Sequence, residues 1–404
     1  MKIIYVTAQL PHGCDEAFIV PEINQLMRSG HQVLVIPRSP RGRVLHGQDL
    51  LPFSRLASLF SPDVLLTAAS STLRTPGRVA EAIRLTRGGR SRAIDLKNLT
   101  VVAKAVWLAE IALAWEADHI HSHWGGTTAT MAMLASHVSG IPWSLTAHRW
   151  DIVENNLLAA KARSASFVRF ISEDGLRMAR SLGIGNAGTS RVLHMGVALP
   201  GSSHGRPPRR RVVLCPARLV AVKGHRFLLE SWRLLRSRGI NAELWLAGDG
   251  NLRRELERLS NTLGIGSSVK FLGAIEHGKL LELYEKNAIS VVVLASVDLG
   301  FGNREGIPVC LIEAMSYAVP VVATATGGAS ELVVPGTGLL VAPEDSHALA
   351  NGIENFLEND ELSRQVGNAG RARIDSEYNI VGVIGELVSA FQSAACRPAA
   401  TRCA

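Results

Sequence analysis

Two glutamates eight residues apart, Glu305 and Glu313, are the residues whose type and spacing most directly indicate chemistry. The segment Gly306-Ile307-Pro308 follows the first of them, and a glycine and a proline here favour the start of a helix that contains Glu313. At about 1.5 Å per helical residue plus a short loop, the two carboxylates lie roughly 8 to 12 Å apart. This span matches a hexose and the ribose of a nucleotide sugar, and the free amides between them suit a pyrophosphate. Two solvated glutamates on a helix are the structural alternative.

Two cations form a second candidate group. Arg218 and Lys223 follow the apolar run 212–215, which is typical of a buried strand. In open α/β sheets, ligands bind beyond the carboxyl ends of the strands, where arginine and lysine can neutralise a diphosphate. A surface loop that happens to be basic is the alternative.

These segments together resemble glycosyltransferase family 4, the retaining, metal-independent group with the GT-B fold. Within it, the chain looks most like the group 1 enzymes of exopolysaccharide and colanic-acid type. The resemblance spans nearly the whole chain, and it is specific in residues 212–345 and looser before them. Three motifs carry it in matching order and spacing: Arg-x4-Lys-Gly at Arg218, Glu-x7-Glu at Glu305, and Thr-Ala-Thr-Gly-Gly-Ala-Ser-Glu at 324–331.

The resemblance implies a role for each of the motif residues. It implies that Arg218 and Lys223 bind the donor diphosphate, that Glu305 contacts the donor hexose, and that Glu313 binds the ribose hydroxyls. It also implies the architecture, in which two Rossmann-like, doubly wound α/β domains face each other across a cleft.

The N-terminal half offers three further site residues through the same resemblance. Segment 15–19 is similar to the Ser-Glu-Thr-Phe-Ile segment of exopolysaccharide-type members, so we expect Gly13 and Glu16 to line the cleft. The commonest family pattern has a Gly-Gly pair there, whereas this chain has Gly13 alone. His148 ends the expected strand 143–148, and by the resemblance it matches the family histidine that contacts the donor sugar. A histidine with a purely structural role is the alternative.

Three alternating histidines could indicate a metal site. His119, His121 and His123 project to one face of an expected strand and could offer two ligands. We expect no metal, because strands of a parallel sheet are buried on both faces and no carboxylate or cysteine is spaced to complete a zinc set. The segment instead resembles the His-x-His-Phe turn of the family, with Trp124 in place of phenylalanine.

Length and composition predict two domains. A chain of 404 residues with 47% hydrophobic residues exceeds the usual size of a single core. Five cysteines without CxxC spacing favour a reducing cytoplasm, and no run is long and apolar enough to span a membrane. We expect an N-terminal acceptor-binding domain at 1–200, a linker at 201–210, a nucleotide-sugar-binding domain at 211–377, and at 378–404 a helix that returns to the first domain. The expected strands are 3–7, 32–36, 119–123, 143–148, 167–172, 191–197, 212–217, 242–248, 269–272, 290–295, 319–323 and 339–342.

Charge is concentrated in the N-terminal half. Residues 1–200 hold 21 Lys and Arg against 14 Asp and Glu, so they carry +7 of the total +8. Residues 74–104 contain eight cations against Glu81 and Asp95, and we expect a basic, partly amphipathic helical surface that could bind anionic lipid headgroups. A solvated basic surface is the alternative. We expect no nucleic acid as partner, because no aromatic residue interleaves the arginines.

The expected function is transfer of a hexosyl group, with retention, from a UDP- or GDP-sugar to a hydroxyl of a lipid-linked saccharide in envelope or exopolysaccharide synthesis. Negative charge grows on the leaving diphosphate, and Arg218 and Lys223 are expected to stabilise it, so no metal or other cofactor is required. The departing phosphate can take the acceptor proton, while Glu305 and His148 position the hexose. The protein is expected in the cytoplasm, with peripheral contact at the inner membrane face. The alternatives are a nucleotide-sugar epimerase and a catalytically silent protein that binds a nucleotide sugar or lipid.

Overall fold

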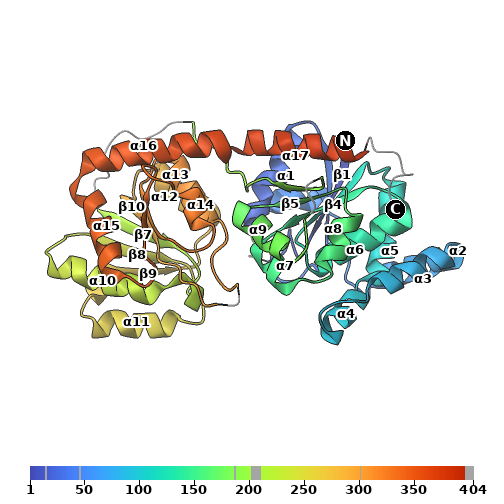
Figure 1. Ribbon diagram of the computed structural model, residues 1–404, viewed down its shortest axis with the longest axis horizontal. Coiled ribbons are helices and arrows are strands. Elements are labelled where there is room, and N and C mark those ends of the chain that lie inside the picture. The colour runs from blue at the N-terminus through green and yellow to red at the C-terminus, as the bar shows by residue number, and fades with distance from the viewer. Residues whose placement is uncertain (14–15, 45–46, 186–187, 202–210, 301, 396–404) are drawn as a thin grey trace. The chain divides into compact units, whose positions relative to one another are not determined.

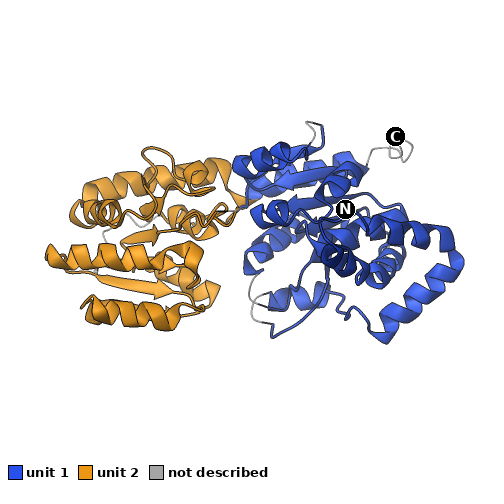
Figure 2. Ribbon diagram, turned by 60° about the horizontal axis from the view of Figure 1, so that its bottom comes forward, with its two compact units in different colours: residues 1–196, 381–404 blue, residues 197–380 orange. Residues whose placement is uncertain are grey.

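The computed structural model divides the chain into two compact units (Figure 2). Unit 1 comprises Met1–Gly196 and Val381–Ala404, and unit 2 comprises Val197–Ile380. The structure describes all residues except 14–15, 45–46, 186–187, 202–210, 301 and 396–404. Most of the expected linker, and the end of the expected tail, therefore lie outside the described residues.

Unit 1 is built on a sheet of six parallel strands in the order β2-β1-β3-β4-β5-β6. Helices cover both faces of this sheet (Figure 1). The strands are β1 (Lys2–Thr7), β2 (Gln32–Pro37), β3 (His119–His123), β4 (Trp143–Ala147), β5 (Phe167–Phe170) and β6 (Ser190–Val192). The helices are α1 (Val20–Arg28), α2 (Pro62–Arg74), α3 (Pro76–Leu85), α4 (Arg92–Leu99), α5 (Val102–Ala114), α6 (Thr127–Ser139), α7 (Arg149–Glu154), α8 (Leu158–Ser164), α9 (Glu173–Ser181) and α17 (Ile380–Ala395), with 3-10 turns at Ala17–Ile19 and Gln48–Phe53.

Unit 2 repeats the same plan with six parallel strands in the order β12-β11-β10-β7-β8-β9. Its strands are β7 (Val212–Pro216), β8 (Glu243–Ala247), β9 (Val269–Gly273), β10 (Val291–Leu294), β11 (Val321–Thr324) and β12 (Leu339–Val341). Its helices are α10 (His225–Ser237), α11 (Arg253–Thr262), α12 (His277–Glu285), α13 (Val309–Ser316), α14 (Ala329–Leu332), α15 (Ser346–Glu358) and α16 (Asp360–Glu377), with 3-10 turns at Ala221–Lys223 and Gly266–Ser268.

Burial explains why these sequences form central strands. Every residue of β10 and β11 is buried, as expected for parallel strands that are covered by helices on both faces. Each of the twelve expected strands is present, with ends that differ by a few residues. The prediction of two doubly wound α/β sheets is thus confirmed.

The last helix belongs to unit 1 although the preceding helix belongs to unit 2. Phe391 on α17 packs against His119 at 4.8 Å and against Phe167 at 5.8 Å between ring centroids. Buried aromatic contacts of this kind attach the helix to the strands β3 and β5.

One expected surface cation is not at the surface. Lys104 on α5 has no exposed area, and its ammonium donates to the carbonyl oxygens of Pro37, Arg38 and Ala57. Burial, with a contribution from Arg38, lowers the pKa of Lys104 to about 7. The prediction that it belongs to the basic surface is wrong, because α5 packs this side chain into the core. Among the described residues, no helix has the length and apolar content needed to cross a membrane.

Candidate active site

Lys223 and Glu305 form an ion pair at the carboxyl edge of the unit 2 sheet. Lys223 ends the 3-10 turn that follows β7, and its ammonium bonds to the Glu305 carboxylate. Ser296, just beyond β10, donates its hydroxyl to the same carboxylate oxygen, Oε2, at 3.0 Å. The side chains of Lys223 and Glu305 are 15% and 14% exposed, so the pair is reachable from solvent. Burial lowers the pKa of Lys223, but the Glu305 carboxylate outweighs it and the pKa is raised overall.

The backbone around Glu305 is held by a glycine turn after β11. Gly327 has φ +50°, and a Cβ there would lie 1.9 Å from the Glu305 carbonyl oxygen. The Gly328 amide donates to that oxygen at 3.4 Å. The two glycines of the motif at 324–331 therefore allow the turn to contact the Glu305 backbone, because only a residue without a side chain permits this close approach.

Glu313 lies on the following helix and has a partner of its own. Helix α13 begins at Val309 with Pro308 as its N-cap, slightly later than the sequence predicts, and Glu313 is inside it as expected. The Glu313 carboxylate is 2.7 Å from Nε2 of His277, at the start of α12. The hydrogen bond to Glu313 raises the pKa of His277. Sequence analysis did not single out His277; its position just after the expected strand 269–272 is the signal that could have found it.

The structure groups some of the predicted unit 2 residues and separates others. Arg218 lies exposed beyond β7, and among the described residues no ion pair joins it to Glu305. Gly306 is partly exposed and Ile307 is buried between Glu305 and α13. Ser296 was missed by sequence analysis, although it directly follows a buried apolar strand. This edge of the sheet thus combines cations, carboxylates and the start of a helix, a set of groups that suits a phosphorylated, hydroxyl-rich ligand.

In unit 1, Glu16 organises the loop after β1. Its carboxylate accepts the amides of Ala8, Gln9 and Leu10 and the indole N–H of Trp124, at 2.6 to 2.9 Å. Gly13 belongs to the same loop, has φ +78°, and donates its amide to the Arg43 carbonyl oxygen at 3.0 Å. With 4% exposure, Glu16 fixes the loop backbone and the Trp124 side chain at once.

His148 stands at the N-cap of α7, directly after β4. Its Nε2 lies 2.8 Å from Nε2 of His123, and its ring lies 4.4 Å from the Trp124 ring. Asp151 accepts the His148 amide at 2.8 Å and so caps the helix. Burial is the main cause that lowers the pKa of His148 well below its ordinary value, which favours the neutral ring.

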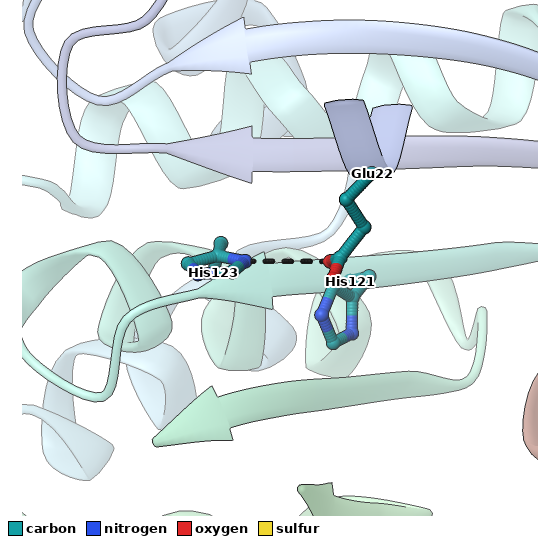
Figure 3. A group of neighbouring side chains, drawn as sticks. All are labelled: Glu22, His121 and His123. Carbon is teal, nitrogen blue, oxygen red and sulfur yellow. Dashed lines mark ion pairs between the residues drawn. The ribbon is translucent and has the colours of Figure 1, made fainter. Parts of the chain in front are cut away.

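Behind His148, the fold brings a carboxylate to the alternating histidines (Figure 3). Glu22 of α1 has ligand atoms within 4.8 Å of those of His121 and His123, and all three side chains are buried. Sequence spacing indicates no carboxylate for these histidines, and it is the packing of α1 on the sheet that supplies Glu22. No sequence spacing could reveal this contact.

The surroundings of this cluster do not suit a cation. Arg169 on β5 donates to Glu22 at 2.7 Å, and Tyr5 donates to the other carboxylate oxygen. His121 is already bonded to Ser144 and Thr146 through its two ring nitrogens. Burial alone would raise the pKa of Glu22, but Arg169 and the neighbouring hydrogen bonds lower it, so the carboxylate is ionised and paired. We therefore still expect no metal, since a cation would have to displace an internal partner from each ligand.

The chain is similar to known glycosyltransferases. Residues 202–373 match the family described as glycosyl transferases group 1. The chain is 26% identical over 295 residues to a GDP-mannose-dependent monoacylated alpha-(1-6)-phosphatidylinositol monomannoside mannosyltransferase of Corynebacterium glutamicum, covering 67% of this chain and 75% of that protein. It is 29% identical over 168 residues to the amylovoran biosynthesis glycosyltransferase AmsK of Erwinia amylovora, covering 41% of each.

A solved structure extends the likeness to the whole chain. The structure of Anabaena Alr3699/HepE in complex with UDP-glucose has a TM-score of 0.73 and 20% identity, and covers 97% of this chain and 100% of that one. At 20% identity, the structural likeness shows the fold alone. Together with the two six-stranded sheets, it confirms the two-domain GT-B fold that the sequence predicts.

Proposed function

We propose that this chain is a glycosyltransferase that moves a hexosyl group, with retention, from a UDP- or GDP-sugar. The proposal is supported by the match of residues 202–373 to the group 1 glycosyl transferases and by the likeness to transferases named for glycolipid and polysaccharide synthesis. The acceptor is a hydroxyl of a lipid-linked saccharide in exopolysaccharide or cell-envelope synthesis. The observation that carries the proposal is the partly exposed Lys223–Glu305 pair with Ser296 beside the start of α13.

The reaction breaks the bond between the anomeric carbon and the donor diphosphate. The acceptor hydroxyl enters from the same face and forms the new bond to that carbon. Its proton passes to an oxygen of the departing phosphate, so the protein does not need a separate base. Negative charge grows on the diphosphate as it leaves, and the groups that stabilise this charge lower the barrier.

Each predicted residue has a role in this scheme. Lys223 and the exposed Arg218 neutralise the diphosphate, helped by the amides of Gly306 and Ile307 before α13. Glu305 accepts hydrogen bonds from the hexose, and Glu313 accepts them from the ribose. The two cations and the helix start supply the positive charge that a metal provides elsewhere, so we expect no metal requirement.

His148 has the remaining role, which is to position the hexose. Gly13 and Glu16 complete the set through the loop after β1, which Glu16 holds in place. These assignments predict losses of turnover and not of folding when the groups on unit 2 are removed, because their side chains are partly exposed.

A thermal-shift screen tests the donor site directly. Purified protein is mixed with UDP, GDP, ADP and their hexose conjugates, with magnesium or with EDTA. A ligand that binds only the native state raises stability by RT ln(1 + [L]/Kd). We expect a selective shift from one nucleotide, unaffected by EDTA and lost in Glu313→Ala. No shift from any nucleotide would contradict the proposal.

Analysis of products separates transfer from the alternatives. An epimerase would convert one nucleotide sugar into another, whereas a transferase releases the nucleoside diphosphate and adds a sugar to an acceptor. The family match favours transfer. Nucleotide binding without release of a diphosphate, across a broad panel of acceptors, would favour the silent binding protein.

Exposed apolar side chains between residues 51 and 99 support contact with a membrane. Of the 16 large apolar side chains that are exposed in the described residues, 10 lie between Leu51 and Leu99. Leu66 and Leu73 on α2 are 71% and 86% exposed, and their spacing of seven places them on one face. Val64 on the same helix is buried, so α2 packs one face against the protein. Leu66 and Leu73 form an apolar stripe on a face that stays exposed.

The charges around this stripe favour an anionic lipid surface. Arg84, Arg87 and Lys97 are exposed on or beside α3 and α4. Cations that surround exposed leucines suit insertion among anionic headgroups, whereas a second copy of the same basic face would be repelled. We propose that the protein acts in the cytoplasm and binds the inner membrane face peripherally, where a lipid-linked acceptor is available.

Vesicle sedimentation tests this contact. The protein is expected to sediment with vesicles of phosphatidylcholine and phosphatidylglycerol, and less with phosphatidylcholine alone. A Leu66→Ser/Leu73→Ser variant should lose binding, whereas Leu182→Ser, a matched exposed leucine outside the stripe, should not. The proposal would be contradicted if the wild type sedimented equally with both kinds of vesicle. It would also be contradicted if the two variants sedimented equally with the vesicles that contain phosphatidylglycerol.

A further inference from the structure

A continuous chain of polar side chains leads from β5 to His148 through the interior of unit 1. Arg169 contacts Glu22 at 2.7 Å, Glu22 contacts the Tyr5 hydroxyl, and that hydroxyl lies 2.9 Å from Nδ1 of His123. The last step joins Nε2 of His123 to Nε2 of His148 at 2.8 Å. The first four side chains have no exposed area, so their partners come from the protein itself.

Arg169, at one end of this hydrogen-bonded series, determines which group donates and which accepts in the first hydrogen bonds. Arg169 can only donate, and its other N–H groups bind the carbonyl oxygens of Leu193 and His194. Glu22 is ionised because Arg169 holds its pKa low against the effect of burial, so it can only accept. The proton between Tyr5 and Glu22 therefore belongs to Tyr5. Since Tyr5 has no second proton, it must accept from Nδ1–H of His123.

The proton positions of the two histidines follow from this. A proton on both nitrogens of His123 would place a second buried cation against a carboxylate that Arg169 already neutralises, which is costly. With Nδ1 protonated and the ring neutral, Nε2 of His123 accepts, and Nε2–H of His148 must donate to it. Nδ1 of His148 is then unprotonated.

We propose that Tyr5, Glu22, His123 and Arg169 are positioning residues that hold His148 as one neutral tautomer, with its only ring proton committed to His123. His148 then serves the donor site as a fixed, neutral ring and does not supply a proton to the leaving group. The role in transfer rests on the proposed function, whereas the tautomer is a property of unit 1 alone.

Packing supports the positioning role of the chain. The His148 ring lies 4.4 Å from the Trp124 ring and 5.6 Å from the Phe18 ring, so two aromatic side chains pack against it in addition to His123. Trp124 is in turn held by Glu16 at 2.6 Å. A ring held by one hydrogen bond and two aromatic contacts keeps a single orientation when a ligand arrives.

Nitrogen-15 NMR of histidine-labelled protein tests the tautomers directly. We expect neutral His148 with the proton on Nε2 and neutral His123 with the proton on Nδ1, each assigned by loss of its signals in a substituted variant. His123→Gln keeps an acceptor near the Nε2 position and should preserve the His148 signature. His123→Leu removes the acceptor and should give a mixture of tautomers.

Assays of sugar transfer on the same variants show whether the hydrogen-bonded series of side chains affects kcat. His123→Leu should lose roughly tenfold to a hundredfold in kcat, as expected for a misplaced group, and His123→Gln should recover most of it. Nucleotide binding should be unchanged in both, because Glu313 and Lys223 lie in unit 2. His119→Gln, a buried histidine on the same strand, controls for a general effect on β3. Tyr5→Phe replaces His123→Leu if that variant does not fold. It removes the hydroxyl that accepts from Nδ1–H of His123, so the His123 proton should no longer be fixed on Nδ1.

Two results would overturn the inference: a proton on Nδ1 of His148 in the wild type, or an unaltered His148 signature in a folded His123→Leu or Tyr5→Phe variant. Failure of the proposed function is a separate result. A wild type that transfers no sugar but shows the expected tautomers would contradict the transferase proposal and leave the positioning chain intact.

Discussion

The two units hold their charged groups in opposite ways. In unit 1, Arg169 and Glu22 form an ion pair without exposed area, and the buried His123 ring lies 3.6 Å from the same carboxylate. In unit 2, the side chains of Lys223 and Glu305 are 15% and 14% exposed, and His277 is 32% exposed beside Glu313. The unit 1 residues lie on α1 and within β3 and β5, whereas the unit 2 residues lie in the loops and helices beyond the strands, so the two sets differ in position as well as in burial.

This difference separates groups that fix geometry from groups that can exchange partners. A buried ion pair cannot replace a lost partner with water, so its arrangement is rigid and expensive to break. A partly exposed pair loses less when it opens, because water compensates each charge. The unit 2 pairs are therefore the ones that the proposed donor could displace, whereas the buried unit 1 network supports the fixed ring that we propose for His148.

The largest expected effect is on the stability of unit 1. Arg169→Met leaves the Glu22 carboxylate buried without its cation, and we expect a loss of about 3 to 5 kcal/mol in the free energy of unfolding of unit 1. Hydrogen exchange of β1, β3 and β5, measured against the strands of unit 2, reports this loss for each unit separately. The matched control is Arg211→Ala, which breaks an exposed pair with Glu358 and should cost at most about 1 kcal/mol. Equal losses in the two variants would remove the distinction between the units.

The next effect is on catalysis in unit 2. Lys223→Ala removes a cation that we propose stabilises the leaving diphosphate, and we expect the barrier to transfer to rise by roughly 3 to 4 kcal/mol. Folding should change little because the side chain is partly exposed. Single-turnover rates measure the effect, with Lys279→Ala, at a surface pair with Glu276, as the control. Near full activity in Lys223→Ala would mean that the pair with Glu305 is structural.

A backbone change gives a smaller effect at the same edge. Gly327→Ala places a Cβ against the Glu305 carbonyl oxygen, so we expect displacement of Glu305 and a loss of about 1 to 3 kcal/mol in donor binding. Gly336→Ala is the matched control, because Gly336 also has a positive φ but has no atom within 4 Å of the added Cβ. Isothermal titration with the donor measures both. Similar affinities in the two variants would show that the turn does not support the site.

The fold could be predicted from the sequence because its signals are local. Strand 119–123 was predicted with its final bounds, since a short run between helical stretches leaves little choice of register. The helix after Glu305 was predicted from a glycine and a proline, and it begins directly after Pro308, which serves as its N-cap. Lys104 was misplaced because its charge was counted without its neighbours, although Ala105 and Val106 on the same helix are buried.

The candidate site was only partly predictable, for a physical reason. The spacing of Lys223, Glu305 and Glu313 indicated a ligand site because strand ends and helix starts share one edge of the sheet. Glu22 and Arg169 carry no such signal, since a single carboxylate on a helix and a single arginine on a strand meet only through packing. Tertiary contacts of this kind depend on how α1 lies on the sheet, which local spacing does not specify.

The smallest effect concerns the pH dependence of the His277–Glu313 pair. The hydrogen bond to Glu313 raises the pKa of His277 above its ordinary value of 6.5. A raised pKa in the folded state contributes stability that is complete below about pH 6.5 and is lost as the pH rises through the folded-state pKa. His277→Gln should therefore cost more stability at pH 5.5 than at pH 9, by at most about 1 kcal/mol because the pair is partly exposed. Thermal unfolding at the two pH values measures this, and a pH-independent difference would show that the pair is held without the proton on His277.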